Sequence, residues 1–172
     1  QGLDLGGTGS HWNCSNPSAD NKSDVDDIGF IENLIDQLIL DYPVIDSKRI
    51  YASGYSNGGF MSYYLACNSK KFAAIGSVAG TMLDDSYQSC NANFPTAMIN
   101  IHGTNDFDVP YDGNTYYPSI PEVVDWWKNF NNTPNEDLLT NQDGSIEQYI
   151  YYNDAGDRYV EHIKIIGGGH YW

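Results

Sequence analysis

The stretch RIYASGYSNGGFMSYYLAC, residues 49–67, carries the strongest local evidence for the fold class of this chain. Its start, RIYAS, is a short β-branched and aromatic run that predicts a strand, and apolar residues at helical spacing predict a helix over 58–68. Between these elements, Gly54 and Gly58 frame Ser56 in the pattern GxSxG. A serine at such a turn has an exposed hydroxyl and is typical of a nucleophile. Because so short a pattern also occurs by chance, a polar residue in a glycine-rich turn is an equal interpretation at this point.

The residues after this stretch alternate between strands and helices. The runs FAAIGSVAG (72–80) and TAMINIHG (96–103) are apolar on both faces and bounded by turn residues, which predicts buried parallel strands. PSIPEVVDWWKNFNN (118–132) predicts a helix with a proline in its first turn. SIEQYIYYNDAGDRYVEHIKII (145–166) predicts a hairpin. We therefore expect the α/β class, with a mainly parallel sheet and flanking helices in a single domain over 1–172.

The residues before this stretch predict a loop and then a helix. Residues 1–24 are rich in Gly, Asn, Ser and Asp and predict an irregular surface loop. DVDDIGFIENLIDQLILDY (24–42) offers an N-cap aspartate, acidic residues in the first turn and an apolar face, and Pro43 ends the pattern. That face consists of Ile28, Ile31, Leu34, Ile35, Leu38 and Ile39.

The composition excludes several classes of partner. Hydrophobic residues make up 41% of the 172 residues, which predicts a folded protein with a buried core. The 23 acidic and 8 basic residues give a formal net charge of −15, which argues against nucleic acid as a partner. No window approaches the roughly 18 uninterrupted apolar residues of a membrane-spanning helix, so we expect no membrane partner.

The three cysteines allow at most one disulfide within the chain. Their spacing fits no zinc motif. Cys67 closes the helix after Ser56 and Cys90 precedes the next strand, so a bridge between them is one interpretation for an exported protein. The other interpretation is that Cys14, Cys67 and Cys90 are three buried free thiols. The sequence does not decide between these two interpretations.

Reactive side chains follow three of the expected strands. In parallel α/β sheets, functional groups collect beyond the carboxyl ends of the strands. Ser56 follows the first strand, Asp106 and Asp108 follow TAMINIHG, and His170 follows the last strand behind three glycines. We prefer Asp106 because it is nearer the strand end. An imidazole can take the serine proton while a carboxylate fixes its tautomer, so these residues predict a catalytic triad. The backbone N–H of Asn57 is a candidate oxyanion donor.

The other histidines are weaker candidates for the base. His162 lies inside a strand pattern, His11 lies in the leading loop, and we interpret His102, at a strand end, as a structural hydrogen-bonding residue. A metal site is an alternative for four polar residues, His102, Asp106, Asp108 and His170. No fixed helical or hairpin spacing supports that alternative, so no metal is expected.

Together these segments resemble the secreted polyhydroxybutyrate depolymerase and feruloyl or acetylxylan esterase group of α/β-hydrolases. The resemblance rests on DVDDIGFIENLID, GYSNGGFMSYYLAC, FAAIGSVAGT, HGTNDFDVPYDG and IIGGGHYW, in that order. The order Ser, Asp, His along the chain is also that of α/β-hydrolases. The resemblance implies a carboxylic ester hydrolase without a cofactor, exported from a bacterial cell, with Ser56 as nucleophile, Asp106 as acid and His170 as base. It also implies that Trp12 lines the site entrance, and we add Tyr55 as a substrate-binding candidate.

The chain departs from this family at both ends. Family members carry several strands before the segment that matches QGLDLGG, among them one whose following loop holds the second oxyanion donor, and they continue beyond His170. We therefore expect the C-terminal part of a hydrolase domain, with the RIYAS strand at an open sheet edge. Exposed apolar faces at such an edge favour pairing with another chain, so a homo-oligomer is expected.

Three other functions are alternatives. The first is a hydroxyalkanoate polyester depolymerase, because the GYSNGG and GGGHYW motifs of this chain are common to the depolymerases and the esterases of the group. A peptidase of the same fold is another alternative, although nothing in the sequence marks a site for an amine leaving group. A non-catalytic remnant with a carbohydrate-binding surface would use the four tryptophans, Trp12, Trp126, Trp127 and Trp172. Because two of them are adjacent on a helix, at least one must face the core.

Overall fold

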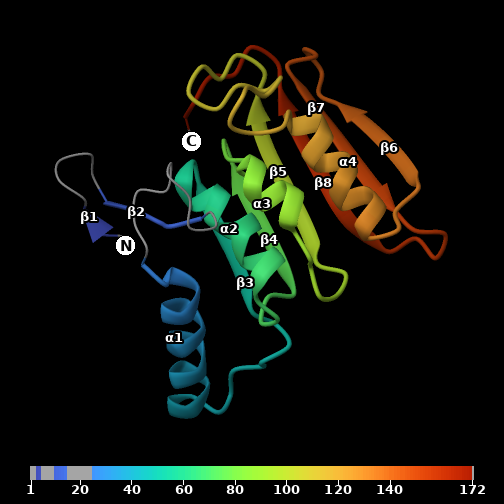
Figure 1. The fold of residues 1–172 in the computed structure, drawn as a ribbon. Helices are drawn as coiled ribbons and strands as arrows, with labels where there is room; N and C mark the ends of the chain where they lie inside the picture. Colours follow the sequence, from blue (N-terminus) through green and yellow to red (C-terminus); the bar gives the residue numbers. More distant parts are fainter. Residues whose placement is uncertain (1–2, 5–9, 15–24, 172) are drawn as a thin grey trace.

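A six-stranded sheet forms the centre of the protein (Figure 1). The computed structural model describes residues 3–4, 10–14 and 25–171. The sheet has the strand order β3-β4-β5-β8-β7-β6. Its strands are β3 (Tyr51–Tyr55), β4 (Ala74–Val78), β5 (Ala97–Gly103), β6 (Asn135–Thr140), β7 (Ile146–Tyr152) and β8 (Arg158–Ile165). The first four in the sheet order are parallel and the other two are antiparallel, so the predicted α/β class with a mainly parallel sheet is confirmed.

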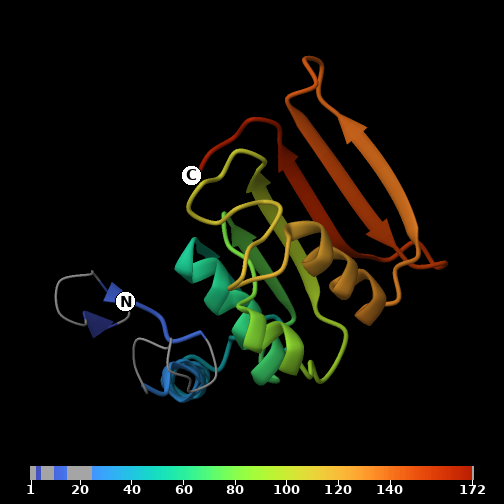
Figure 2. The ribbon, with the colours of Figure 1, turned by 45° about the horizontal axis from the view of Figure 1, so that its top comes forward.

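The helices of the described residues lie mostly on one face of this sheet. They are α1 (Asp27–Asp41), α2 (Asn57–Asn68), α3 (Asp84–Ser89) and α4 (Ile120–Phe130). α2 packs on β3 and β4, and α4 packs on β5 and β8, whereas α1 lies beyond the β3 edge (Figure 1, Figure 2). Among the described residues, no helix is both long and apolar enough to cross a membrane.

Local capping explains where the two outer helices begin. The Asp26 side chain accepts a hydrogen bond from Gly29 N (2.7 Å), so the cap of α1 lies within the predicted aspartate run. At α4, the Ser119 and Glu122 side chains satisfy each other's backbone N–H groups in a capping box. Pro121 occupies the first turn, where its missing N–H costs nothing.

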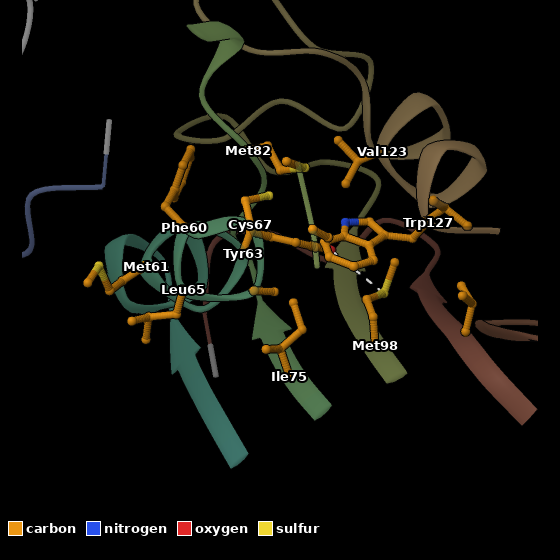
Figure 3. Packing of buried hydrophobic residues seen from close by; sticks show 14 of the residues in the cluster. Phe60, Met61, Tyr63, Leu65, Cys67, Ile75, Met82, Met98, Val123 and Trp127 are labelled. Atoms are coloured by element: carbon orange, nitrogen blue, oxygen red, sulfur yellow. Dashed lines mark hydrogen bonds between the residues drawn. The ribbon is translucent and has the colours of Figure 1, made fainter. Parts of the chain in front are cut away.

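The hydrophobic core lies between α2, α4 and the sheet (Figure 3). Trp127 and Tyr63 are fully buried, and the Tyr63 hydroxyl points to Met98 Sδ at 3.9 Å. The prediction that one of the paired tryptophans faces the core is therefore confirmed. A disulfide joins Cys67 at the end of α2 to Cys90, which decides between the two interpretations of the cysteines, and Cys14 is the free, buried thiol.

The helix α1 is less buried than its periodicity suggests. Leu34 is 46% exposed and Leu38 is 40% exposed. β3 is the edge strand of the described sheet, and a groove of about 540 Å³ lies between α1, β3 and α2. The prediction that RIYAS forms an edge strand is thus confirmed for the described residues. Among the described residues, part of the apolar α1 face therefore stays exposed beside the edge strand.

Several short elements differ from the sequence predictions. β1 (Leu3–Asp4) and β2 (Ser10–His11) pair with each other, so the predicted irregular loop is wrong for these residues, while 1–2, 5–9 and 15–24 lie outside the described residues. Two-residue strands are too short for a periodic pattern. The sequence also missed α3 and β6, because α3 is only 6 residues long and β6 is a largely exposed strand without alternation.

The central strands are buried on one face only. In β5, Met98 and Asn100 lie under the helices and are buried, whereas Ile99 and Ile101 on the other face are half-buried. The prediction of strands buried on both faces is therefore wrong for this structure. No helix of the described residues packs on the second face, so its apolar side chains keep part of their exposure.

Candidate active site

Ser56 stands at the sharp turn between β3 and α2. Its φ of 50° and ψ of −119° lie in a region that non-glycine residues rarely adopt. Ser56 N donates to Val78 O (2.8 Å), and Ser56 O accepts from Gly59 N (2.8 Å) and Phe60 N (3.1 Å). Hydrogen bonds on both sides of the residue therefore hold the strained backbone in place.

Close backbone approach explains two of the glycines around Ser56. A Cβ on Gly54 would lie 2.2 Å from the Gly58 carbonyl carbon, and a Cβ on Gly59 would lie 2.5 Å from Ser77 Oγ. A Cβ on Gly58 would meet no described atom within 4 Å. Gly54 and Gly59 thus permit the turn, whereas the Gly58 position of the GxSxG pattern has room for a side chain.

The structure brings three predicted site residues together at the carboxyl ends of the strands. His170 Nε2 lies 2.9 Å from Ser56 Oγ, and His170 Nδ1 lies 2.8 Å from Asp106 Oδ2. The Asp106 side chain is fully buried and that of His170 is 14% exposed. These partners assign one neutral tautomer, in which Nδ1–H donates to the carboxylate and Nε2 accepts from the serine hydroxyl.

The loop after β5 fixes the second oxygen of Asp106. Asp106 Oδ1 accepts hydrogen bonds from Asp108 N (3.0 Å) and Val109 N (2.8 Å). Such local turns are typical of aspartate, and they point Oδ2 toward His170. Asp108 is exposed, and its backbone N–H, rather than its carboxylate, serves the site. The sequence preference for Asp106 agrees with this geometry.

The buried His102 side chain, at the end of β5, contacts the same loop. Its Nε2 lies 2.8 Å from Val109 O and 3.4 Å from Asp106 Oδ2. Burial lowers the pKa of His102, so the ring is neutral near pH 7 and donates to the Val109 carbonyl. The interpretation of His102 as a structural hydrogen-bonding residue agrees with these contacts.

His162 lies away from Ser56. Its Nε2 is 3.0 Å from the Tyr111 hydroxyl, and its Nδ1 is 3.4 Å from Asn100 O. Burial lowers the pKa of His162 to about 4, so the ring is neutral at neutral pH. The other candidate, His11, lies in β2.

The two residues that flank Ser56 make contacts that the sequence did not suggest. The Tyr55 hydroxyl donates to His170 O (2.9 Å), and the two rings lie 5.1 Å apart. The Asn57 side chain is hydrogen-bonded to the backbone of Trp12, whose side chain lines the groove beside α1. Tyr55 therefore lies against His170, and Trp12 reaches the site through its backbone.

The same side chains form the one group of metal-ligand type found among the described residues. Asp106, Asp108 and His170 each offer a ligand atom, and these atoms lie within 4.8 Å of one another. However, His170 Nδ1 and Asp106 Oδ2 are hydrogen-bonded to each other, and His170 Nε2 faces Ser56. This arrangement favours proton transfer at Ser56 over metal binding.

The family of the chain follows from comparison with known proteins. A family model described as phospholipase/carboxylesterase matches residues 11–151. The chain belongs to this family of α/β-hydrolases.

Curated relatives carry esterase names. A probable feruloyl esterase C from Aspergillus niger is 39% identical over 51% of this chain and 32% of its own length. A feruloyl esterase B from Piromyces equi is 29% identical over 96% of this chain and 32% of its own length. A bifunctional acetylxylan esterase/xylanase from Neocallimastix patriciarum is 27% identical over 96% of this chain and 23% of its own length. The chain thus spans about a third or less of the length of these relatives.

Solved structures support the fold. An acylaminoacyl peptidase from Pyrococcus horikoshii superposes with a TM-score of 0.56 at 15% identity and covers 85% of this chain and 24% of its own. Another acylaminoacyl peptidase structure, in complex with a chloromethyl ketone, gives a TM-score of 0.53 at 17% identity. At this identity the likeness concerns the α/β-hydrolase fold alone.

Proposed function

We propose that the protein is a serine hydrolase of carboxylic esters in which Ser56, His170 and Asp106 form the catalytic triad. The observation that carries this proposal is the continuous hydrogen-bonded chain from Ser56 Oγ through His170 to Asp106 Oδ2, at 2.9 and 2.8 Å. Family membership and the esterase names of the relatives support the reaction class. The turn at Ser56 then serves as a nucleophile elbow.

In the proposed mechanism, Ser56 Oγ attacks the ester carbonyl carbon while His170 Nε2 takes the hydroxyl proton. Asp106 stabilises the imidazolium that forms. The Asn57 backbone N–H lies at the first position of α2, where helix N–H groups have no intrahelical partner, and donates to the oxyanion. Collapse of the intermediate releases the alcohol with the proton from His170, and water repeats the sequence on the acyl-enzyme.

The proposed substrates are short acyl or aryl esters, including acetyl or feruloyl groups on polysaccharide, as the names of the relatives suggest. A hydroxyalkanoate polyester is the second candidate, since the exposed Phe107 and Tyr171 adjoin Asp106 and His170 in the chain and offer apolar contacts. A carbohydrate-binding remnant is less supported because Trp127 is fully buried and Trp172 lies outside the described residues.

The disulfide between Cys67 and Cys90 supports export of the protein to an oxidising compartment. The relatives above are fungal, so nothing in the comparisons supports the bacterial source that the resemblance implied. A single domain over residues 1–172 stays part of the proposal.

We also propose a homo-oligomer that pairs through the open β3 edge. The edge strand carries exposed Tyr51, and the groove beside it exposes Phe30 and Leu34. Exposed apolar surface at an unpaired strand favours association. Light scattering at micromolar concentration tests this proposal, and a monodisperse monomer contradicts it.

The central experiment treats the protein with a fluorophosphonate and maps the adduct by mass spectrometry. We expect one adduct on Ser56 and hydrolysis of p-nitrophenyl acetate that is lost in Ser56→Ala. Ser53→Ala, at an exposed serine of the preceding strand β3, is the matched control and should keep the adduct and the turnover. Equal rates in wild type and Ser56→Ala would contradict the triad, and a protein that binds xylan without turnover or adduct would be a binding remnant.

A further inference from the structure

The Asn57 side chain ties the segment Trp12–Cys14 to the start of α2. Asn57 Oδ1 accepts from Trp12 N (2.5 Å), and Asn57 Nδ2 donates to Trp12 O (3.1 Å) and to Cys14 Sγ (3.4 Å). The amide thus pairs with both polar groups of one peptide residue, 45 positions away in the chain. These bonds are partly buried, where an unpaired polar group is costly.

Further contacts hold the same segment, among them a hydrogen bond from Asn13 Nδ2 to Val25 O (2.9 Å). Asn13 N donates to the buried Asp27 carboxylate at the start of α1 (2.7 Å). The Ser86 hydroxyl of α3 donates to Cys14 O (3.1 Å). Three helices therefore converge on three consecutive residues, and the contact nearest to the nucleophile is the one that Asn57 makes.

The bonding pattern distinguishes a positioning role from direct contact with the substrate. An amide nitrogen carries two N–H groups, and both Asn57 N–H groups point to the segment. None is left for the substrate oxyanion, which the backbone N–H of the same residue is proposed to bind. The side chain therefore faces the segment while the backbone faces the reacting ester.

We propose that Asn57 is a positioning residue whose side chain clamps Trp12–Cys14 against the nucleophile turn, so that this segment forms a wall of the ester site. This proposal rests on the proposed function for its kinetic consequence, whereas the clamp itself is tested without any substrate. The wall would act on substrate binding, because the triad and the Asn57 backbone N–H do not depend on the amide side chain.

Cys14 supplies a direct measure of the clamp. It is the free cysteine of the chain, since the other two form the disulfide. Burial, followed by the nearby Asp85 carboxylate, raises the pKa of the Cys14 thiol to about 12. A buried thiol of this kind reacts with an alkylating reagent only when the segment opens.

The test compares iodoacetamide labelling of Cys14 in native wild type, Asn57→Ala and Asn68→Ala. Asn68 is the matched control, because it lies at the other end of α2 and its side chain donates, within the described part of the chain, to Tyr64 O alone. Each lost hydrogen bond of about 1 kcal/mol net is about fivefold in the opening equilibrium, so we expect about 10- to 100-fold faster labelling in Asn57→Ala. Asn68→Ala should label at the wild-type rate, and Cys14→Ser should show no label.

The kinetic arm measures KM and kcat separately, with p-nitrophenyl butyrate as the ester. We expect Asn57→Ala to raise KM by about tenfold and to change kcat by less than about threefold. Asp27→Ala, which removes the tether on α1 without touching Ser56, should raise both the labelling rate and KM in the same direction. This second variant keeps the test valid if Asn57→Ala fails to fold.

The possible outcomes separate the two proposals. Equal labelling of Asn57→Ala and Asn68→Ala overturns the clamp, whatever the activity. Faster labelling with an unchanged KM, or an equal loss of kcat and kcat/KM, overturns the wall and leaves a structural role only. Faster labelling in a protein whose wild type shows neither turnover nor a Ser56 adduct keeps the clamp and refutes the esterase, and with it the wall.

Discussion

Asp106→Asn is the most informative substitution at the candidate triad. Asp106 Oδ1 accepts from two backbone N–H groups, so an asparagine must place its carbonyl oxygen there and its NH2 at the position of Oδ2. That NH2 faces His170 Nδ1 at 2.8 Å and can only donate to it. The proton of the neutral ring then lies on Nε2, 2.9 Å from Ser56 Oγ, where it cannot act as a base.

The expected loss follows from this reversal of the tautomer. In Ser-His-Asp enzymes the same exchange lowers kcat by about 10⁴, which corresponds to about 5 kcal/mol of activation free energy. The assay is hydrolysis of p-nitrophenyl acetate from pH 5 to 10, together with the rate of fluorophosphonate labelling. Circular dichroism should show an unchanged fold, because the substitution keeps the size of the side chain and the two bonds to Oδ1.

Asp108→Asn is the matched control for this experiment. Asp108 lies two residues further on, is exposed, and is not hydrogen-bonded to His170 through its carboxylate. We expect its activity to stay within about threefold of wild type, as for a surface substitution outside the bonded network. Retention of more than a tenth of the activity in Asp106→Asn, or an equal loss in Asp108→Asn, would refute the assignment of the acid.

Three further predictions concern stability and are checked by denaturant or thermal unfolding. Removing the Cys67–Cys90 bridge by a double serine substitution should lower the unfolding free energy by about 3 kcal/mol, because the bridge spans 23 residues and restricts the unfolded chain; no change would show that the bridge is dispensable. His162 has a folded pKa of about 4, below its unfolded value near 6.5. Its neutral form therefore stabilises the fold fully above pH 6.5, and on the order of 2 to 3 kcal/mol should be lost as the pH falls to 4. In His162→Gln, the unfolding free energy should fall less steeply with decreasing pH. An unchanged pH dependence would assign the loss of stability to other titrating groups. Gly54→Ala should cost about 1 to 3 kcal/mol through backbone overlap, whereas Gly58→Ala should be neutral or stabilising, and equal effects would contradict the packing of the turn.

The candidate site could be predicted from the sequence because its polar residues each directly follow a predicted strand. Ser56, Asp106 and His170 each follow a strand of the parallel sheet, and parallel strands place their carboxyl ends together. The prediction of their proximity therefore needed only the strand order along the chain. The contacts of Tyr55 and Asn57 could not be found in this way, because they join residues 115 and 45 positions apart without any periodic pattern.

Residue patterns along the chain were enough to predict the α/β class, the order of the long elements, the turn that carries Ser56, and the candidate partners Asp106, Asp108 and His170. Hydrophobic periodicity and turn residues are local signals, and they suffice for these features. The pairing of Cys67 with Cys90 was left open by the sequence and follows from the folded chain, which also shows the hydrogen bond between the preferred Asp106 and His170. The hydrogen bonds between the Asn57 side chain and the Trp12 backbone also appear only in the folded chain. They depend on which atoms meet in space after folding, and no local pattern signals them.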